Sequence, residues 1–234
     1  MLLSGSDILV KTLIEQGADT VFGYPGGQIL NVYDSLYKYQ NEINHVLTAH
    51  EQGAAHAADG YARTTGKVGV VISTSGPGAT NLVTGIATAN MDSIPMVCIM
   101  GQVVKELLGT DGFQEAHMTS VCQSISKHTY SVTDAAQLPD IIEEAFFVAQ
   151  SGRPGPVVID IPKDVFEQNM DIPYNKGTVR GRILNKYKPC QVNKEQVKKV
   201  AEYTKQAERP MLVVGGGVNN RIADSTLLVN LAQK

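Results

Sequence analysis

The sequence predicts an α/β fold, with a doubly wound, mostly parallel sheet and helices on both faces. Strand-like and helix-like patterns alternate from the N-terminus, the strand-like runs are apolar without a period-two alternation, and Gly/Pro-rich turns separate them. A strand that is apolar on both sides is buried on both faces, as it is when helices cover each face of a parallel sheet. With 234 residues, the chain is long enough for one domain and part of another.

The individual elements follow from periodicity and from stop signals. In the first predicted helix, Ile8, Leu9 and Leu13 form an apolar face, and Gly17 marks the C-terminal end. The predicted helices cover residues 6–16, 27–37, 77–90 and 138–150, together with a stretch after residue 49 that runs to about Thr65. The predicted strands cover residues 20–23, 43–49, 67–73, 95–101 and 156–161.

The pattern divides the chain into three parts. The doubly wound domain spans residues 1–165. Residues 166–190 are polar, contain Pro173, Gly177, Gly181 and Pro189, and have the composition of a linker. Residues 191–234 carry a predicted helix (194–205), a strand (210–214) and a further helix, which is the start of a second, Rossmann-like α/β domain.

Composition excludes several classes of protein. The net charge is −3 and no basic cluster is present, which disfavours nucleic-acid binding. No apolar run reaches membrane-spanning length, and the polar N-terminus is unlike a signal peptide. Cys98, Cys122 and Cys190 are odd in number and widely spaced, so they are expected to be buried or idle thiols in a reducing cytoplasm rather than ligands of a metal. We therefore expect a cytoplasmic protein without membrane contact.

Four predicted turns at carboxyl ends of strands are rich in glycine or other small residues. They are G-Y-P-G-G-Q (23–28), A-H-E-Q-G (49–53), T-S-G-P-G-A-T-N (74–81) and G-Q-V (101–103). Ligands of doubly wound sheets bind at this edge, and glycine lets the backbone approach a flat ligand closely. Each turn taken alone is equally well explained as a tight βα connection, and none continues as a phosphate-binding Lys-Ser/Thr motif.

Glu51 has two interpretations. As a first-turn acid it complements the helix dipole, and spacing alone favours that interpretation. As the acid/base of a site, it would be followed by small residues that let a ring or another chain pack closely. A zinc-protease H-E-x-x-H motif is excluded because the next histidine after His50 is His56, six positions later.

The motifs resemble, in order, the N-terminal domain of thiamine-diphosphate-dependent enzymes. The resemblance rests on G-Y-P-G-G, A-H-E-Q-G-A-A-H-A-A-D-G-Y-A-R, T-S-G-P-G-A-T-N, D-S-I-P-M-V, G-T-D-G-F-Q-E, S-G-R-P-G-P-V and D-I-P-K-D-V. It is closest to the catalytic subunits of acetohydroxyacid synthase (acetolactate synthase) and covers the whole chain, most densely from about Gly23 to Asp164.

The resemblance implies a role for Glu51. The matching glutamate contacts N1′ of the cofactor's aminopyrimidine ring and favours the tautomer that removes the C2 proton; burial raises the proton affinity of such a carboxylate. The small residues after Glu51 imply close packing of two copies, as a homodimer or tetramer, with the cofactor held mainly by the partner chain. A small regulatory subunit is a further possible partner.

The resemblance also assigns other residues. The expected thiamine diphosphate contacts, besides Glu51, are Tyr24, Pro25, Gly26, Gly27, Pro77, Gly78 and Asn81. Gln114 and Lys163 match catalytic positions, Gln28 and Phe113 match substrate-lining positions, and Arg153 and Gly215, Gly216 and Gly217 match FAD contacts. Without the resemblance, Arg153 and Lys163 are ordinary surface cations and the glycine triplet is a turn.

The family's Gly-Asp-Gly and Asn-Asn motif for diphosphate and Mg²⁺ is absent from these 234 residues, so the chain alone is expected to be inactive. The implied reaction decarboxylates pyruvate and joins it to pyruvate or 2-oxobutyrate, for branched-chain amino-acid synthesis. Alternatives are a catabolic acetolactate synthase, pyruvate oxidase or glyoxylate carboligase, or a non-catalytic α/β binding module. Glyoxylate carboligase is disfavoured because it lacks the activating glutamate.

Overall fold

A computed structural model describes residues 2–171, 191–219 and 222–233. The chain divides into two units, Met1–Tyr187 and Lys188–Lys234, which are described separately.

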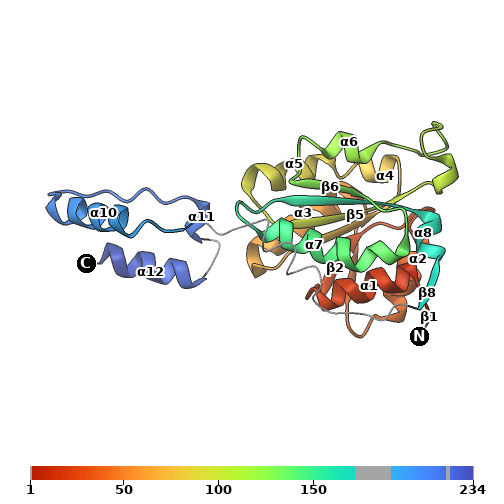
Figure 1. Ribbon diagram of the computed structural model, residues 1–234, viewed down its shortest axis with the longest axis horizontal. Coiled ribbons are helices and arrows are strands. Elements are labelled where there is room, and N and C mark those ends of the chain that lie inside the picture. The colour runs from red at the N-terminus through yellow and green to blue at the C-terminus, as the bar shows by residue number, and fades with distance from the viewer. Residues whose placement is uncertain (1, 172–190, 220–221, 234) are drawn as a thin grey trace. The chain divides into compact units, whose positions relative to one another are not determined.

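The first unit is built on a six-stranded parallel sheet with the strand order β3-β2-β4-β5-β7-β6 (Figure 1). Its strands are β2 (Thr20–Gly23), β3 (Asn44–Leu47), β4 (Gly69–Ser73), β5 (Met96–Gln102), β6 (His128–Ser131) and β7 (Pro156–Pro162). The chain leaves β2 in one direction, to β3, and later returns to the other side of β2 with β4. A crevice between the loops after β2 and β4 is therefore expected at the carboxyl edge, where the direction of winding reverses.

Helices cover both faces of this sheet (Figure 1), as the apolar strands predict. They are α1 (Gly5–Glu15), α2 (Leu30–Lys38), α3 (Glu51–Thr65), α4 (Pro77–Thr80), α5 (Val83–Asp92), α6 (Met118–Cys122), α7 (Leu138–Gln150) and α8 (Lys163–Glu167), with 3₁₀ turns at Lys105–Leu107 and Ala135–Gln137.

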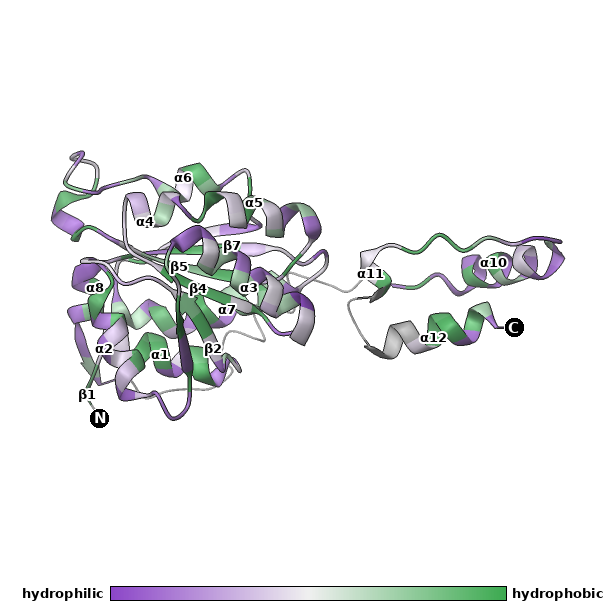
Figure 2. Cartoon of the chain, turned by 180° about the vertical axis from the view of Figure 1, so that it is seen from behind, coloured by the Kyte–Doolittle hydropathy of each residue, from purple (hydrophilic) through white to green (hydrophobic). Residues whose placement is uncertain are grey.

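Each central strand contributes to two cores. In β5, Val97 and Ile99 pack with the residues of α1 and α7, whereas Cys98 and Met100 pack with those of α3 and α5. All seven residues of β5 are buried. Figure 2 shows the central strands coloured as hydrophobic, and two-sided burial explains why their sequences lack alternation.

Several predicted elements differ in detail. Residues 20–23 and 138–150 form their elements as predicted. The helix predicted for 27–37 begins at Leu30, and the helix predicted for 77–90 is divided into α4 and α5. The division occurs where the amide of Leu82 donates to the carbonyl of Ala79, which is a tighter 3₁₀-type turn.

The predicted linker begins later than residue 166. Phe166 is fully buried in α8, and β8 (Asn169–Asp171) pairs antiparallel with β1 (Leu2–Ser4). These short strands, and β6 with its H-T-Y-S sequence, were missed because each is too short to show a period. Residues 172–190, the rest of the predicted linker, lie outside the described residues.

In the second unit, α10 (Lys194–Gln206) confirms the predicted helix, and the Asn193 side chain caps it by accepting from the Glu195 and Gln196 amides. The strand predicted for residues 210–214 is wrong, because none of these residues is in a strand. A strand requires a neighbour for its amides and carbonyls, and the described residues of this unit offer none. The helices α11 (Gly216–Asn219) and α12 (Ile222–Ala232) follow. Throughout the described residues, every helix is too short or too polar to span a membrane.

Candidate functional site

The candidate site lies at the carboxyl edge of the sheet, around the switch between β2 and β4. The loop 23–28 follows β2, Glu51 follows β3, and the loop 74–81 follows β4. The parallel arrangement therefore brings all four predicted glycine-rich turns to one edge, including 101–103 at the end of β5, where a Cβ on Gly101 would lie 2.6 Å from the Gln28 carbonyl oxygen.

Glu51 is the first residue of α3, with His50 as the N-cap whose Nδ1 accepts from the Gln52 amide at 3.1 Å. Its carboxylate does more than complement the helix dipole, because Glu51 Oε2 accepts a hydrogen bond from Asn81 Nδ2 at 3.0 Å. This bond links α3 to the loop after β4. Glu51 and Asn81, predicted to share a site from residues 30 positions apart, are therefore in contact.

Thr74 is the centre of close packing between the loops. Its Oγ1 accepts from the backbone amide of Gln28 at 3.2 Å. A Cβ atom added to Gly26 would lie 2.4 Å from Thr74 Cγ2, and one added to Gly78 would lie 2.7 Å from Thr74 Cγ2 and 3.2 Å from Glu51 Oε1. A side chain at either of these two positions would require Thr74 to move. The sequence analysis did not single out Thr74, although it belongs to the T-S-G-P-G motif.

Buried polar atoms gather on the same elements. Gln28 Oε1, Ser75 Oγ and Tyr33 Oη have no hydrogen-bond partner among the described residues. Burial raises the pKa of the Tyr33 phenol, and the negative charge of Glu51 raises it further, so this hydroxyl lies within the field of the carboxylate. Tyr33, on α2, was not identified from the sequence because an apolar helix face predicts only packing.

The donor set suits a flat, nitrogen-containing ring. It combines a carboxylate, two glycines packed closely against Thr74, and buried hydroxyl and amide groups that lack partners among the described residues. Tyr24, Pro25, Gly27 and Pro77 lie on the same two loops, and Tyr24 is exposed. The residues present therefore fit the aminopyrimidine that the resemblance implies.

The loop 103–117 packs against the loop that follows β4. A Cβ on Gly76 (φ +57°) would lie 2.7 Å from the Gln114 carbonyl oxygen, so the backbone of Gln114 packs directly on the loop after β4. Phe113 beside it is 82% exposed. Lys163 begins α8 at the carboxyl end of β7, on the same edge.

Arg153 lies elsewhere. It precedes β7 and is therefore at the amino edge, opposite Glu51. Its guanidinium donates to the carbonyls of Asn90 and Met91 at 3.0 Å and to Ser93 Oγ at 2.8 Å, capping the C-terminus of α5. Gly215, Gly216 and Gly217 belong to the second unit. Within the first unit, Arg153 therefore lies at the edge of the sheet opposite Glu51.

Two further features bear on other predictions. Cys98 and Cys122 are free and buried, as predicted, whereas Cys190 lies outside the described residues. In the part of the chain that the structure describes, no three His, Cys, Asp or Glu side chains are grouped to hold a metal ion.

A surface pocket of about 380 Å³ lies over α1, α2 and α8, away from Glu51. Two of its charged groups pair, since Lys38 Nζ donates to Asp7 Oδ2 at 2.7 Å, and Ser35 Oγ donates to Asp7 Oδ1 at 3.1 Å. None of the predicted site residues lines this pocket.

Comparison with known proteins identifies the family to which the chain belongs. A model described as "Thiamine pyrophosphate enzyme, N-terminal TPP binding domain" matches residues 3–123. The acetolactate synthase of Arthrospira platensis is 51% identical over 219 residues, which are 92% of this chain and 37% of that protein. The isozyme 3 large subunit of Escherichia coli is 46% identical over 92% of this chain and 37% of its own length. The large subunit of Corynebacterium glutamicum is 48% identical over 92% of this chain and 34% of its own. The chain therefore spans little more than a third of the length of these relatives.

Proposed function

The chain belongs to the thiamine pyrophosphate enzymes, and from this premise we propose that it is part of the catalytic subunit of an acetolactate synthase. The subunit would decarboxylate pyruvate and condense the product with pyruvate or 2-oxobutyrate. The products would be acetolactate or acetohydroxybutyrate, for valine, leucine and isoleucine synthesis in the cytoplasm. The names of the relatives support this choice within the family.

The hydrogen-bonded pair of Glu51 and Asn81 carries the proposal. When bound, thiamine diphosphate supplies the carbon nucleophile for 2-oxo acids and the electron sink for loss of carbon dioxide. Glu51 would hold a proton at the ring nitrogen, and Asn81 would keep the carboxylate in place. Gly78 leaves room beside Glu51 Oε1 for the ring to approach.

Other residues would complete the site. Tyr24, Pro25, Gly26, Gly27 and Pro77 would line the ring. Gln114 and Lys163 would contact the reacting acid, with Gln28 and Phe113 at its border. A second copy of the chain, packed along α3, would hold most of the cofactor. Mg²⁺ and the diphosphate would bind to sequence that these residues do not contain.

The domain organisation is also proposed. Residues 1–165 would form the pyrimidine-binding domain and 191–234 the start of an FAD-associated domain. Gly215, Gly216 and Gly217 would approach the flavin. Arg153 would contact it through guanidinium N–H groups other than those that donate to Asn90, Met91 and Ser93.

The test compares wild type with Glu51→Gln in the complete polypeptide, supplied with pyruvate, thiamine diphosphate, Mg²⁺ and FAD. Glutamine keeps an acceptor for Asn81 but holds no proton, so acetolactate formation should fall by about 10²- to 10⁴-fold. Glu15→Gln, at an exposed position at the far end of α1, is the matched control and should leave the rate unchanged. Residues 1–234 alone should make no acetolactate.

The other outcomes separate the alternatives. Pyruvate consumption with hydrogen peroxide as a product would indicate a pyruvate oxidase. Acetolactate formation without bound flavin would indicate the catabolic enzyme, and carboligation of glyoxylate would indicate glyoxylate carboligase. Neither pyruvate turnover nor cofactor binding would leave a non-catalytic α/β binding module.

A further inference from the structure

We propose that Asp160 and Asp164 are positioning residues that hold both ends of the loop 103–117, and with it Gln114, against the Glu51 site. The two aspartates flank the turn from β7 into α8, where Lys163 also lies. The catalytic part of this inference rests on the proposed function, whereas the anchoring part concerns only this chain.

Asp164 holds the beginning of the loop. Its Oδ1 accepts from the backbone amide of Lys105 at 3.0 Å, and its Oδ2 pairs with Lys105 Nζ at 3.3 Å. Lys105 Nζ also donates to the carbonyl of Thr133 at 3.2 Å. The carboxylate therefore fixes the backbone, and the lysine side chain extends the anchor to the segment after β6.

Asp160 holds the end of the loop through Gln102, the last residue of β5. Gln102 Nε2 donates to Asp160 Oδ2 at 3.2 Å and to the Ala116 carbonyl at 2.9 Å, while Gln102 Oε1 accepts from the Val103 amide at 2.9 Å. The amide group is thus fully engaged on both sides. Because Asp160 occupies one of the two donor directions, it sets the orientation in which the other reaches Ala116.

The burial of Asp160 argues for a specific use. Asp160 and Gln102 are only 7% and 3% exposed. Burial raises the pKa of Asp160 to about 7, and Asp160 Oδ1 has no hydrogen-bond partner among the described residues. A buried carboxyl group with an unpaired oxygen stabilises the fold less than an apolar side chain of the same size would. We therefore expect Asp160 to serve a purpose other than stability. The orientation of Gln102 is the purpose that the geometry indicates.

The loop between the anchors is closed on itself. The Glu115 carboxylate accepts from the amides of Gly109 at 2.5 Å and Gly112 at 3.2 Å, and these bonds lower its pKa. Gln114 adopts a positive φ of 63° and packs on Gly76. A loop that is internally tied should shift as one piece when an anchor is removed, so its contact at Gly76 would change.

Hydrogen exchange in the complete polypeptide tests the anchors directly. Asp164→Ala should speed exchange of the Lys105 amide by roughly tenfold, and Asp160→Ala should do the same for the Val103 amide, as expected for the loss of one hydrogen-bonded anchor. Asp164→Asn and Asp160→Asn keep an acceptor oxygen and should restore most of the protection. The Gly109 amide, bonded to Glu115, is the internal reference, and Glu15→Ala is the control for loss of a carboxylate.

Unchanged exchange at Lys105 and Val103 in both alanine variants would overturn the anchoring. A uniform increase that includes the amides of β5 would also overturn it, since it would indicate general destabilisation. If Asp160→Ala does not fold, Asp164→Ala carries the test, because the Asp164 side chain is 32% exposed and tolerates truncation more readily.

Kinetics test the catalytic part. The alanine variants should raise KM for pyruvate by about tenfold, as expected when one hydrogen bond that positions the loop is lost. The Kd for thiamine diphosphate should stay unchanged, and the asparagine variants should return KM close to the wild-type value. If KM does not change although acetolactate is formed, the loop does not position the substrate and the inference fails. If wild type forms no acetolactate while the exchange results hold, the proposed function fails and the anchors stand.

Discussion

The amide of Asn81 holds the carboxylate of Glu51 at 3.0 Å, and in doing so it joins the N-terminus of α3 to the turn between α4 and α5. A first-turn acid that only complements a helix dipole needs no such partner and usually points to solvent. The bond gives Glu51 a fixed orientation next to Gly78, where a Cβ would come within 3.2 Å of Glu51 Oε1. This geometry supports the proposed role of Glu51 as a site carboxylate rather than as a first-turn acid alone.

Asn81→Asp should impair the proposed activity more than Asn81→Ala does. Two carboxylates at hydrogen-bond distance cannot both ionise, so the pair would share a proton and the pKa of the pair would rise. We expect a loss of roughly 10²-fold for Asn81→Asp, and a smaller loss for Asn81→Ala, which only frees Glu51. Acetolactate formation measured from pH 5 to pH 9 checks this. Wild-type rates in Asn81→Asp would contradict the role of the pair.

Gly78→Ala should destabilise the first unit by about 1–3 kcal/mol. The added methyl group would lie 2.7 Å from Thr74 Cγ2, and Thr74 is itself buried. Urea unfolding measures the change. Gly60→Ala is the matched control, since nothing lies within 4 Å of its Cβ position in α3, and it should be neutral or stabilising by up to about 1 kcal/mol. Equal effects of the two substitutions would show that Thr74 yields to the methyl group.

Much of the fold could be predicted because burial leaves a mark on sequence. Strands buried on both faces, such as β5, read as unbroken apolar runs, and the turns around Gly26 and Gly78 read as glycine-rich motifs. The strand expected at residues 210–214 failed for a complementary reason. An apolar run shows that a strand could be buried, but only a neighbouring strand can pair with its backbone.

The parts of the site that were missed depend on contacts between distant segments. Thr74 and Tyr33 are common residue types whose meaning comes from what packs on them: the Gln28 amide in one case and the charge of Glu51 in the other. The bond between Gln102 and Asp160, which are 58 positions apart, leaves no local pattern at all. Arg153 is the opposite case. It belongs to a clear sequence motif, S-G-R-P-G-P-V, but in the structure its side chain caps the C-terminus of α5.

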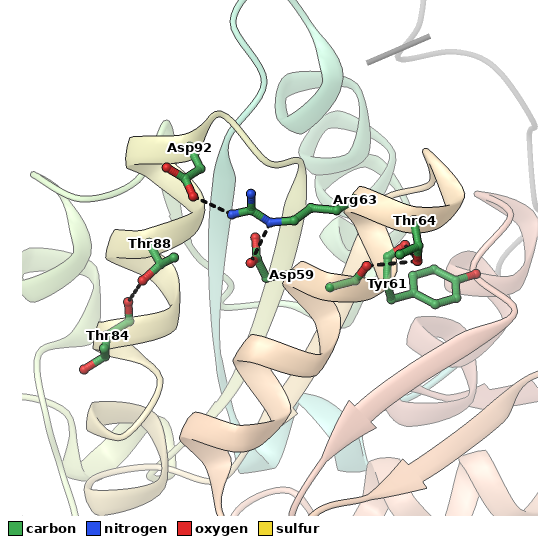
Figure 3. Close-up of polar contacts among 8 residues, drawn as sticks. Asp59, Tyr61, Arg63, Thr64, Thr84, Thr88 and Asp92 are labelled. Atoms are coloured by element: carbon green, nitrogen blue, oxygen red, sulfur yellow. Dashed lines mark hydrogen bonds and ion pairs between the residues drawn. The ribbon is translucent and has the colours of Figure 1, made fainter. Parts of the chain in front are cut away.

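Arg63 ties together the far ends of the two helices that start at the site, α3 and α5 (Figure 3). Its Nε donates to Asp59 Oδ2 at 2.9 Å and its Nη2 donates to Asp92 Oδ2 at 2.6 Å. Asp59 is buried, and Arg63→Ala would leave its carboxylate without this cation, at a cost of about 2 kcal/mol. Asp92→Ala, which removes only the exposed partner, should cost under about 1 kcal/mol. Urea unfolding distinguishes the two, and similar losses would contradict the central place of Asp59.

Asp160 should make the free energy of unfolding depend on pH. Burial raises its pKa from 3.8 to about 7, against the opposing effects of the Gln102 hydrogen bond and of His117, with Glu115 raising it further. Cys122 also faces it and, with its own pKa raised to about 11, stays neutral over this range. The folded chain therefore keeps a proton that the unfolded chain releases between about pH 4 and pH 7. The contribution of Asp160 to the free energy of unfolding is therefore fully present at about pH 4. It is lost as the pH rises to about 7, and the loss is roughly 4 kcal/mol at most.

Asp160→Asn removes this titration, because its amide stays neutral while its oxygen can still accept from Gln102. The variant should show a flatter profile from pH 4 to pH 8 and should be the more stable form at pH 8, where wild type must bury a charge. Urea unfolding at unit intervals of pH measures both curves, with Glu15→Gln as the control that should follow wild type. If the free energies of unfolding of wild type and Asp160→Asn change with pH in parallel, Asp160 has an ordinary pKa in the folded chain. Burial of Asp160 would then not explain the pH dependence of stability.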